Sequence, residues 1–143
     1  MDKPTFIYVT YIVTTLEQLW EELTSESFTQ QYWEDGQLQS DWQVGSSIQQ
    51  VNQNGESVDI GEVLQSEPPY RLTYTVQVTD TTEAQPSRVR FELEQSGATV
   101  KLTLIHHRLD AQSCMAMGHR WTASLSYLKQ LLETKEDLLR LVA

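Results

Sequence analysis

Apolar residues at every second position dominate the second half of the chain, and this period constrains the fold more than any other feature. It runs through residues 71–78, 88–94 and 100–107, where apolar side chains alternate mostly with polar or charged ones. A strand with one buried and one solvated face has this pattern. Ser96-Gly97 predicts a hairpin turn between the last two of these strands.

The first half of the chain predicts one strand, two short helices and then further strands. Residues 6–13 are β-branched and aromatic, as in a strand. Two possible capping boxes at residues 14–18 predict the start of a helix, and a second short helix is expected to end near Tyr32-Trp33. Asn54-Gly55 predicts a two-residue hairpin turn, in which both central residues need positive φ. The strands expected in this half lie around residues 38–42, 47–53 and 57–65.

A long helix is expected from about Ser113 to about Leu139. Only this segment has the length and the apolar stripe to cover the sheet. We therefore expect a single domain over residues 1–143, with an α+β fold in which the C-terminal helix covers one antiparallel sheet of about six or seven strands. The two short helices follow the first strand. The stripe consists of Met117, Trp121, Leu125, Leu128 and Leu132.

Charge excludes one class of partner. Twenty acidic and ten basic residues give a formal net charge of −10. Residues 1–70 alone carry −11, and residues 71–143 carry +1. Nucleic-acid binding needs clustered Lys and Arg, so nucleic acid is not an expected partner. The acidic half either meets a basic partner or is simply a solvated face.

The sequence also lacks the signals of export and of membrane insertion. No apolar run approaches the roughly 18 residues that span a bilayer, and no signal peptide is apparent. Cys114 is the single cysteine, which excludes an intrachain disulfide and a cysteine-based zinc site. We expect a cytoplasmic location and no membrane insertion.

Several local motifs together resemble a known family. The most specific runs Gly61-Glu62-Val63-Leu64-x-x-x-Pro68-Pro69-x-Arg71-Leu72-x-Tyr74-Thr75, and others lie at residues 11–24, 89–93, 102–106 and 121–129. Their order and spacing resemble the family named after the C-terminal domain of the heat-shock-protein-90 ATPase activator, within the START-related helix-grip superfamily. The resemblance covers roughly residues 6–135 and implies the helix-grip fold, in which a curved antiparallel sheet of about six or seven strands wraps around a long C-terminal helix. The family often has Gly immediately before the helix Trp, where this chain has Arg120.

A bent sheet cannot touch a straight helix along its whole length, so we expect an apolar cavity between them, the usual form of a small-ligand site. The same side chains could equally form plain core, because aromatic and Met residues at these spacings often do. The candidates for the cavity lining are Tyr8, Ile12, Trp33, Leu72, Tyr74, Phe91, Leu104, His106, Met117, Trp121 and Leu125.

The histidines do not predict a metal site. His106 and His107 are neighbours on a strand and point to opposite faces, so they cannot readily bind one ion together. His106 shares the inward face with Leu104, whereas His119 lies near the start of the final helix and could approach it. His106 either orients the polar end of a ligand or is a core histidine hydrogen-bonded to a neighbour. No motif nominates a catalytic residue, a metal or a cofactor.

Three functions remain in view. The first is noncatalytic binding of a hydrophobic or amphipathic small molecule between sheet and helix. The second, which the resemblance implies, is a co-chaperone-like module with a protein partner. The third is a cyclase or hydrolase that uses the same cavity and therefore needs ionisable groups converging there.

Overall fold

The computed structural model describes residues 4–32, 36–77 and 86–142. The order of its elements is the one that the sequence predicts. Trp33 and Val78, which the sequence assigns to the second helix and to a strand, lie outside the described residues. In chain order the elements are β1 (Phe6–Ile12), α1 (Leu16–Leu23), α2 (Glu26–Tyr32), β2 (Gln37–Gln39), β3 (Ser47–Val51), β4 (Ser57–Glu67), β5 (Arg71–Val76), β6 (Ser87–Ser96), β7 (Thr99–His107) and α3 (Ala111–Val142).

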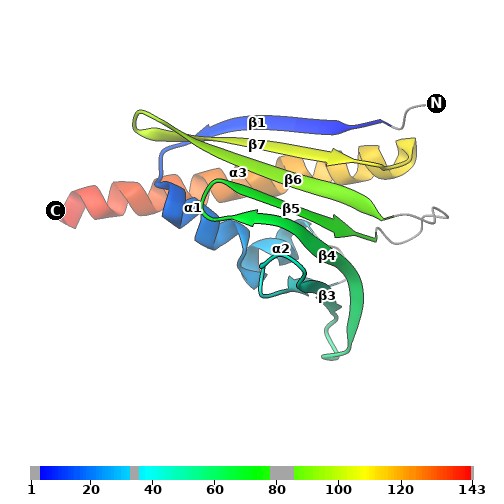
Figure 1. Ribbon diagram of the computed structural model, residues 1–143. Helices are drawn as coiled ribbons and strands as arrows, with labels where there is room; N and C mark the ends of the chain where they lie inside the picture. Colours follow the sequence, from blue (N-terminus) through cyan, green and yellow to red (C-terminus); the bar gives the residue numbers. More distant parts are fainter. Residues whose placement is uncertain (1–3, 33–35, 78–85, 143) are drawn as a thin grey trace.

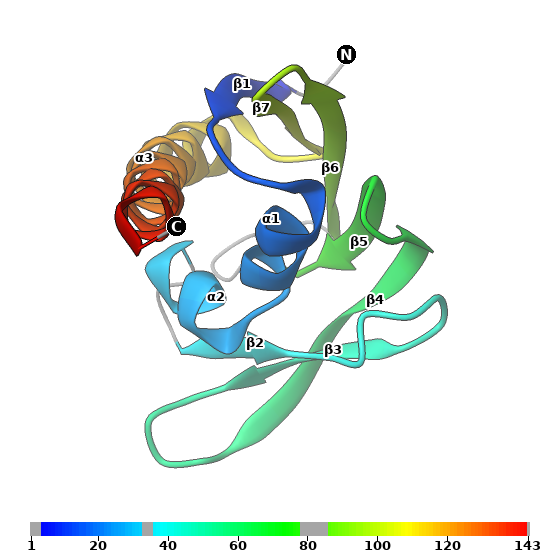
Figure 2. The same cartoon turned by 90° about the vertical axis from the view of Figure 1, so that its left-hand side faces the viewer.

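The strands form one curved antiparallel sheet in the order β1-β7-β6-β5-β4-β3-β2. The sheet bends into a half-barrel, α3 lies across its open side, and α1 and α2 fill the space between α3 and the β2–β4 end (Figure 2). The expected α+β helix-grip architecture is therefore confirmed. The predicted hairpin at Ser96-Gly97 is also present, because Ser96 pairs with Thr99.

A turn is present at Asn54-Gly55, but the prediction of a two-residue turn is wrong because the turn is longer. The ladder between β3 and β4 closes at the pair Val51–Ser57, so residues 52–56 form the loop. The Asn52 side-chain oxygen accepts hydrogen bonds from the amides of Asn54 and Glu56 at 2.9 and 3.0 Å, and it holds this longer turn. Gly55 has a φ of 82°, but Asn54 does not have the positive φ that a two-residue turn needs.

The bend of the sheet is concentrated in β4. Register shifts occur between Ile48 and Gln49, where β3 meets β4, and between Val63 and Gln65, where β4 meets β5. Such bulges bend a strand and increase its twist. At Gly61 the neighbouring strand comes so close that an added Cβ would lie 1.7 Å from the Thr75 carbonyl oxygen. Only glycine allows this approach.

Helix α3 is longer than the sequence predicts, and its final turns extend beyond the strands (Figure 1). Its middle is fixed to the C-terminal end of β1. Lys129 Nζ donates a hydrogen bond to the Tyr11 carbonyl (2.5 Å) and another to Glu133 Oε2 (2.8 Å). The Val13 amide donates to the same carboxylate (3.0 Å). The predicted apolar stripe is confirmed, since each of its members is at most 1% exposed: Met117, Trp121, Leu125, Leu128 and Leu132.

Candidate functional site

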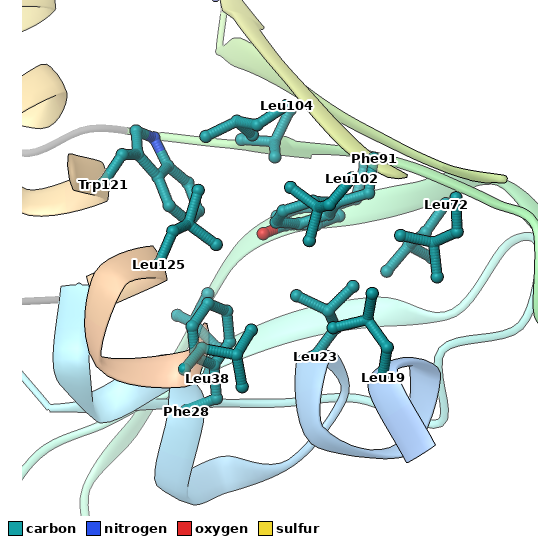
Figure 3. Packing of buried hydrophobic residues seen from close by; sticks show 14 of the residues in the cluster. Leu19, Leu23, Phe28, Leu38, Leu72, Phe91, Leu102, Leu104, Trp121 and Leu125 are labelled. Atoms are coloured by element: carbon teal, nitrogen blue, oxygen red, sulfur yellow. The ribbon is translucent and has the colours of Figure 1, made fainter. Parts of the chain in front are cut away.

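The candidates for a cavity lining meet in the core, on the inner face of the sheet and the facing side of α3 (Figure 3). Tyr8 on β1 is half-buried, and Trp33 lies outside the described residues. The structure thus brings the other candidates together as parts of one packed cluster. Each of these is at most 1% exposed: Ile12, Leu72, Tyr74, Phe91, Leu104, His106, Met117, Trp121 and Leu125.

Aromatic rings run in series through this cluster. Trp42, in the loop between β2 and β3, contacts Tyr74 edge-on with ring centroids 5.4 Å apart. Tyr74 lies 6.4 Å from Phe91, which in turn meets Trp121 edge-on at 5.7 Å. Trp121 then packs against the imidazole of His106 at 6.0 Å. The series connects the surface at Trp42 with the deepest part of the core.

His106 lies at the centre of a buried hydrogen-bond chain. The Trp121 indole N–H, which can only donate, points at His106 Nδ1 (2.9 Å). The proton of the neutral ring therefore lies on Nε2, which donates to Ser87 Oγ (2.9 Å). The Ser87 hydroxyl in turn donates to the Val76 carbonyl (2.9 Å). Both ring nitrogens are engaged, so His106 has the contacts of a core histidine.

Burial keeps His106 neutral. Desolvation, with a smaller contribution from the nearby charge of His107, lowers the pKa of His106 from 6.5 to about 3. His107 points to the outer face, as the alternation predicts, and burial followed by the charge of Arg88 lowers its pKa as well. At neutral pH the imidazole of His106 is therefore a fixed dipole in the core.

The remaining ionisable groups do not converge on the core. The His119 side chain is exposed and does not approach His106. Among the described residues no carboxylate is buried, and no group of three or more His, Cys, Asp or Glu could hold a metal ion. Within residues 4–32, 36–77 and 86–142, the buried polar side chains other than His106 are those of threonines, serines, Tyr74 and Trp121.

A small hollow opens at the seam between α2 and α3. It has a volume of about 60 Å³, and its apolar lining comes from Phe28, Tyr127, Leu128 and Leu131. Phe28 and Leu128 belong to the core cluster, so the hollow borders the core, and Glu22 and Ser27 complete its lining. The larger hollows formed by described residues lie elsewhere, beside Trp42 and on the outer face of the sheet.

One buried hydroxyl on α3 has no partner. Ser124 is 3% exposed, and its Oγ makes no hydrogen bond. It precedes Leu128 by one helical turn and Leu131 by two, so it lies on the side of α3 that faces the seam. A buried hydroxyl without a partner costs about 1–3 kcal/mol. Such a group is a natural anchor for the polar end of a bound molecule.

Sequence comparison places the chain in a family. The family model described as "Activator of Hsp90 ATPase homolog 1-like protein" matches residues 13–133. The chain belongs to this family. The match spans β2–β7, both short helices and most of α3, so the resemblance noted from the sequence motifs is confirmed. No curated protein matches the sequence.

Solved structures of other proteins share the fold of this family member. Protein MLL2253 from Mesorhizobium loti has a TM-score of 0.75 and 21% identity, over 92% of this chain and 98% of that one. The Aha1 dimer from Colwellia psychrerythraea has a TM-score of 0.70 and 20% identity, over 91% and 96%. CalU16 from Micromonospora echinospora has a TM-score of 0.69 and 21% identity, over 89% and 73%. At these identities the likeness shows the fold alone.

Sequence reasoning missed three residues that shape the site in this family member. Sequence reasoning assigned neither Ser87 nor Ser124 a role in the core, but both serines are buried. The alternation of β6 could have placed Ser87 inward with Val89 and Phe91. No comparable signal marks Trp42, which lies in a loop. Within the described residues, no helix is long and apolar enough to cross a membrane.

Proposed function

We propose that the chain binds an apolar or amphipathic small molecule between the sheet and α3, without catalysis. The ligand reaches the core through the seam between α2 and α3. The observation that carries the proposal is the buried, unpartnered hydroxyl of Ser124, which lies one helical turn before Leu128, a residue that lines the hollow. Membership of a helix-grip family, in which ligand binding and cyclase-like activities are common, supports the same location.

The binding mode follows from the chemistry of the core. A volume of about 60 Å³ holds little more than a water molecule, so α2 and α3 move apart when the ligand enters. The hydrocarbon part of the ligand then contacts Leu125, Leu128 and Trp121, and its affinity comes from burial of apolar surface. The polar end accepts or donates a hydrogen bond at Ser124 Oγ. His106 stays bonded to Trp121 and Ser87 and forms the polar end wall.

A titration with 1-octanol, a neutral amphiphile, tests this proposal. The protein carries four tryptophans, and each indole N–H gives its own signal in a ¹⁵N NMR spectrum. We expect saturable shifts of the Trp121 signal, because this ring lies on α3 beside the ligand. Ser124→Ala should weaken octanol binding by about fivefold, the equivalent of one neutral hydrogen bond.

A matched substitution controls for changes in the helix itself. Ser126 is exposed on α3 two residues away, so Ser126→Ala should leave octanol binding unchanged. Ser124→Ala should not unfold the protein, because it removes a buried group that has no partner. Equal binding by both variants, or a Trp121 signal that does not move, contradicts the proposal.

The second candidate function is a protein-interaction module of the Hsp90-activator type. The specific observation in its favour is the net charge of −11 over residues 1–70, which suits a basic partner. The family description names an Hsp90 ATPase activator, and a structural relative is described as a dimer. This function predicts binding to a protein at low salt that is lost at high salt, without dependence on Ser124.

A further inference from the structure

Two hollows adjoin at the loop between β2 and β3. One has a volume of about 470 Å³, the other of about 420 Å³, and Thr24, Asp41 and Trp42 line both. We call the pair the Trp42 groove. Beyond the three shared residues, its lining includes Trp20, Glu26, Ser40, Val44, Ser47 and Pro68. It lies on a different side of α1 and α2 from the seam with α3.

Two tryptophans give the groove its aromatic walls. Trp20 on α1 and Trp42 are both half-buried and pack against the core cluster. Trp42 is also held through its backbone, since its amide donates to Ser40 Oγ (3.0 Å) and its carbonyl accepts from Ser66 Oγ (2.7 Å). The edge-on contact with Tyr74 fixes the ring. These contacts hold the Trp42 wall of the groove in position.

The charged side chains among the described lining residues of the groove are all negative. Among the described residues that line it, the charged side chains are Glu26 and Asp41, and both are exposed carboxylates. The ion pairs of the described chain lie elsewhere, and neither carboxylate takes part in one. The other polar lining consists of hydroxyls and side-chain amides. An anionic molecule is repelled here, and a cationic one is attracted.

We propose that the Trp42 groove binds a lysine- or arginine-bearing segment of a protein partner. Cations are attracted to the faces of tryptophan rings, and the apolar stems of Lys and Arg lie well along them. The carboxylates of Asp41, which lines both hollows, and of Glu26, which lines the first, complement the charge of such a segment. Two adjoining hollows, on either side of Trp42, offer more length than a single small amine fills. This site is separate from the small-molecule site and does not depend on it.

A short basic peptide, acetyl-Gly-Arg-Gly-Arg-Gly-amide, serves as the probe in a ¹⁵N NMR titration of the full chain at low salt. We expect saturable shifts of the indole signals of Trp20 and Trp42, while the Trp121 signal stays in place. Asp41→Asn should weaken binding by about threefold to fivefold, as expected for an exposed charge pair. The same peptide with neutral citrulline in place of arginine should not bind.

Two controls separate this site from general attraction to an acidic protein. Glu56 is exposed in the loop between β3 and β4, outside the groove, so Glu56→Gln should leave peptide binding unchanged. Equal weakening by Glu56→Gln and Asp41→Asn overturns the proposal, because the effect is then one of net charge. Binding of spermidine as tight as that of the peptide overturns the protein-segment assignment. Shifts of Trp121 instead of Trp42 place the peptide at the other site and also overturn it.

Discussion

At the scale of single residues, one buried imidazole organises the polar part of the core. His106 joins α3 to β6 through Trp121 and Ser87, and the chain ends on the backbone of β5 at Val76. Each of these bonds has one direction, because the indole can only donate. A fully satisfied buried network specifies one packing arrangement, whereas a half-satisfied one is costly. His106 thus determines how α3 packs against the sheet.

Acid should destabilise the fold through His106. The unfolded imidazole binds a proton near pH 6.5, whereas the folded one resists protonation until about pH 3. The unfolded state therefore binds more protons between these values, and stability falls as the pH drops, by about 1.4 kcal/mol per unit. His106→Leu lowers stability at pH 7. Only the wild type loses stability through His106 on acidification, so the difference in unfolding free energy between the two proteins should be about 2 kcal/mol smaller at pH 5 than at pH 7. Urea unfolding at both pH values measures this difference.

His119→Gln is the matched control for that experiment. His119 is exposed on α3 and lies outside the network, so His119→Gln should lower stability at pH 7 far less than His106→Leu does. A constant difference between His106→Leu and wild type at pH 7 and pH 5 contradicts the assignment of a neutral, buried imidazole.

The sequence could predict the place of His106 but not its partners. The alternation in β7 puts His106 beside Leu104 on the inner face, and the structure agrees. Ser87 and Trp121 come from segments 19 and 15 residues away, and which of them meet depends on strand register and on the rotation of α3. Local sequence patterns carry no information on the strand register or on the rotation of α3. The helical spacing could have placed Ser124 on the buried side of α3, but whether its hydroxyl finds a partner depends on the same long-range contacts.

At the scale of elements, the bend in β4 decides whether the sheet can surround α3. Gly61 allows the β5 backbone at Thr75 to approach where any side chain would collide with it. The sequence marks this position only as part of a motif, because a strand glycine has several structural explanations. The bulges beside it follow from backbone pairing across strands, which no single segment encodes.

Gly61→Ala should destabilise the protein by about 3 kcal/mol or more, since backbone and not a flexible side chain blocks the new Cβ. Gly55→Ala provides the comparison. Gly55 has positive φ but open space around it, so alanine there should cost about 1 kcal/mol. Chemical unfolding of both variants measures the difference. Equal losses contradict the view that the close approach of β4 and β5 shapes the sheet.

At the scale of the whole molecule, the period of two in the strands and the long apolar stripe of α3 predicted the type and order of the elements correctly, whereas the family resemblance implied the curvature of the sheet. Both patterns are repeated signals, so single exceptions do not disturb them. The hollows are different, because they form where elements from distant parts of the chain fail to fill space. The seam joins α2 to α3, and the Trp42 groove joins α1 to the loop after β2 and the end of β4. Two separate hollows of different character result, one mostly apolar and one with exposed carboxylates in its lining.

Native mass spectrometry of the purified protein, followed by denaturing extraction, tests the central claim most directly. If the core between the sheet and α3 binds an amphipathic molecule, the spectrum should show a reproducible adduct of one small molecule per chain. Extraction then identifies its chemical class. A spectrum of the bare chain alone, both as purified and after incubation with extracted lipids, would contradict the account of small-molecule binding.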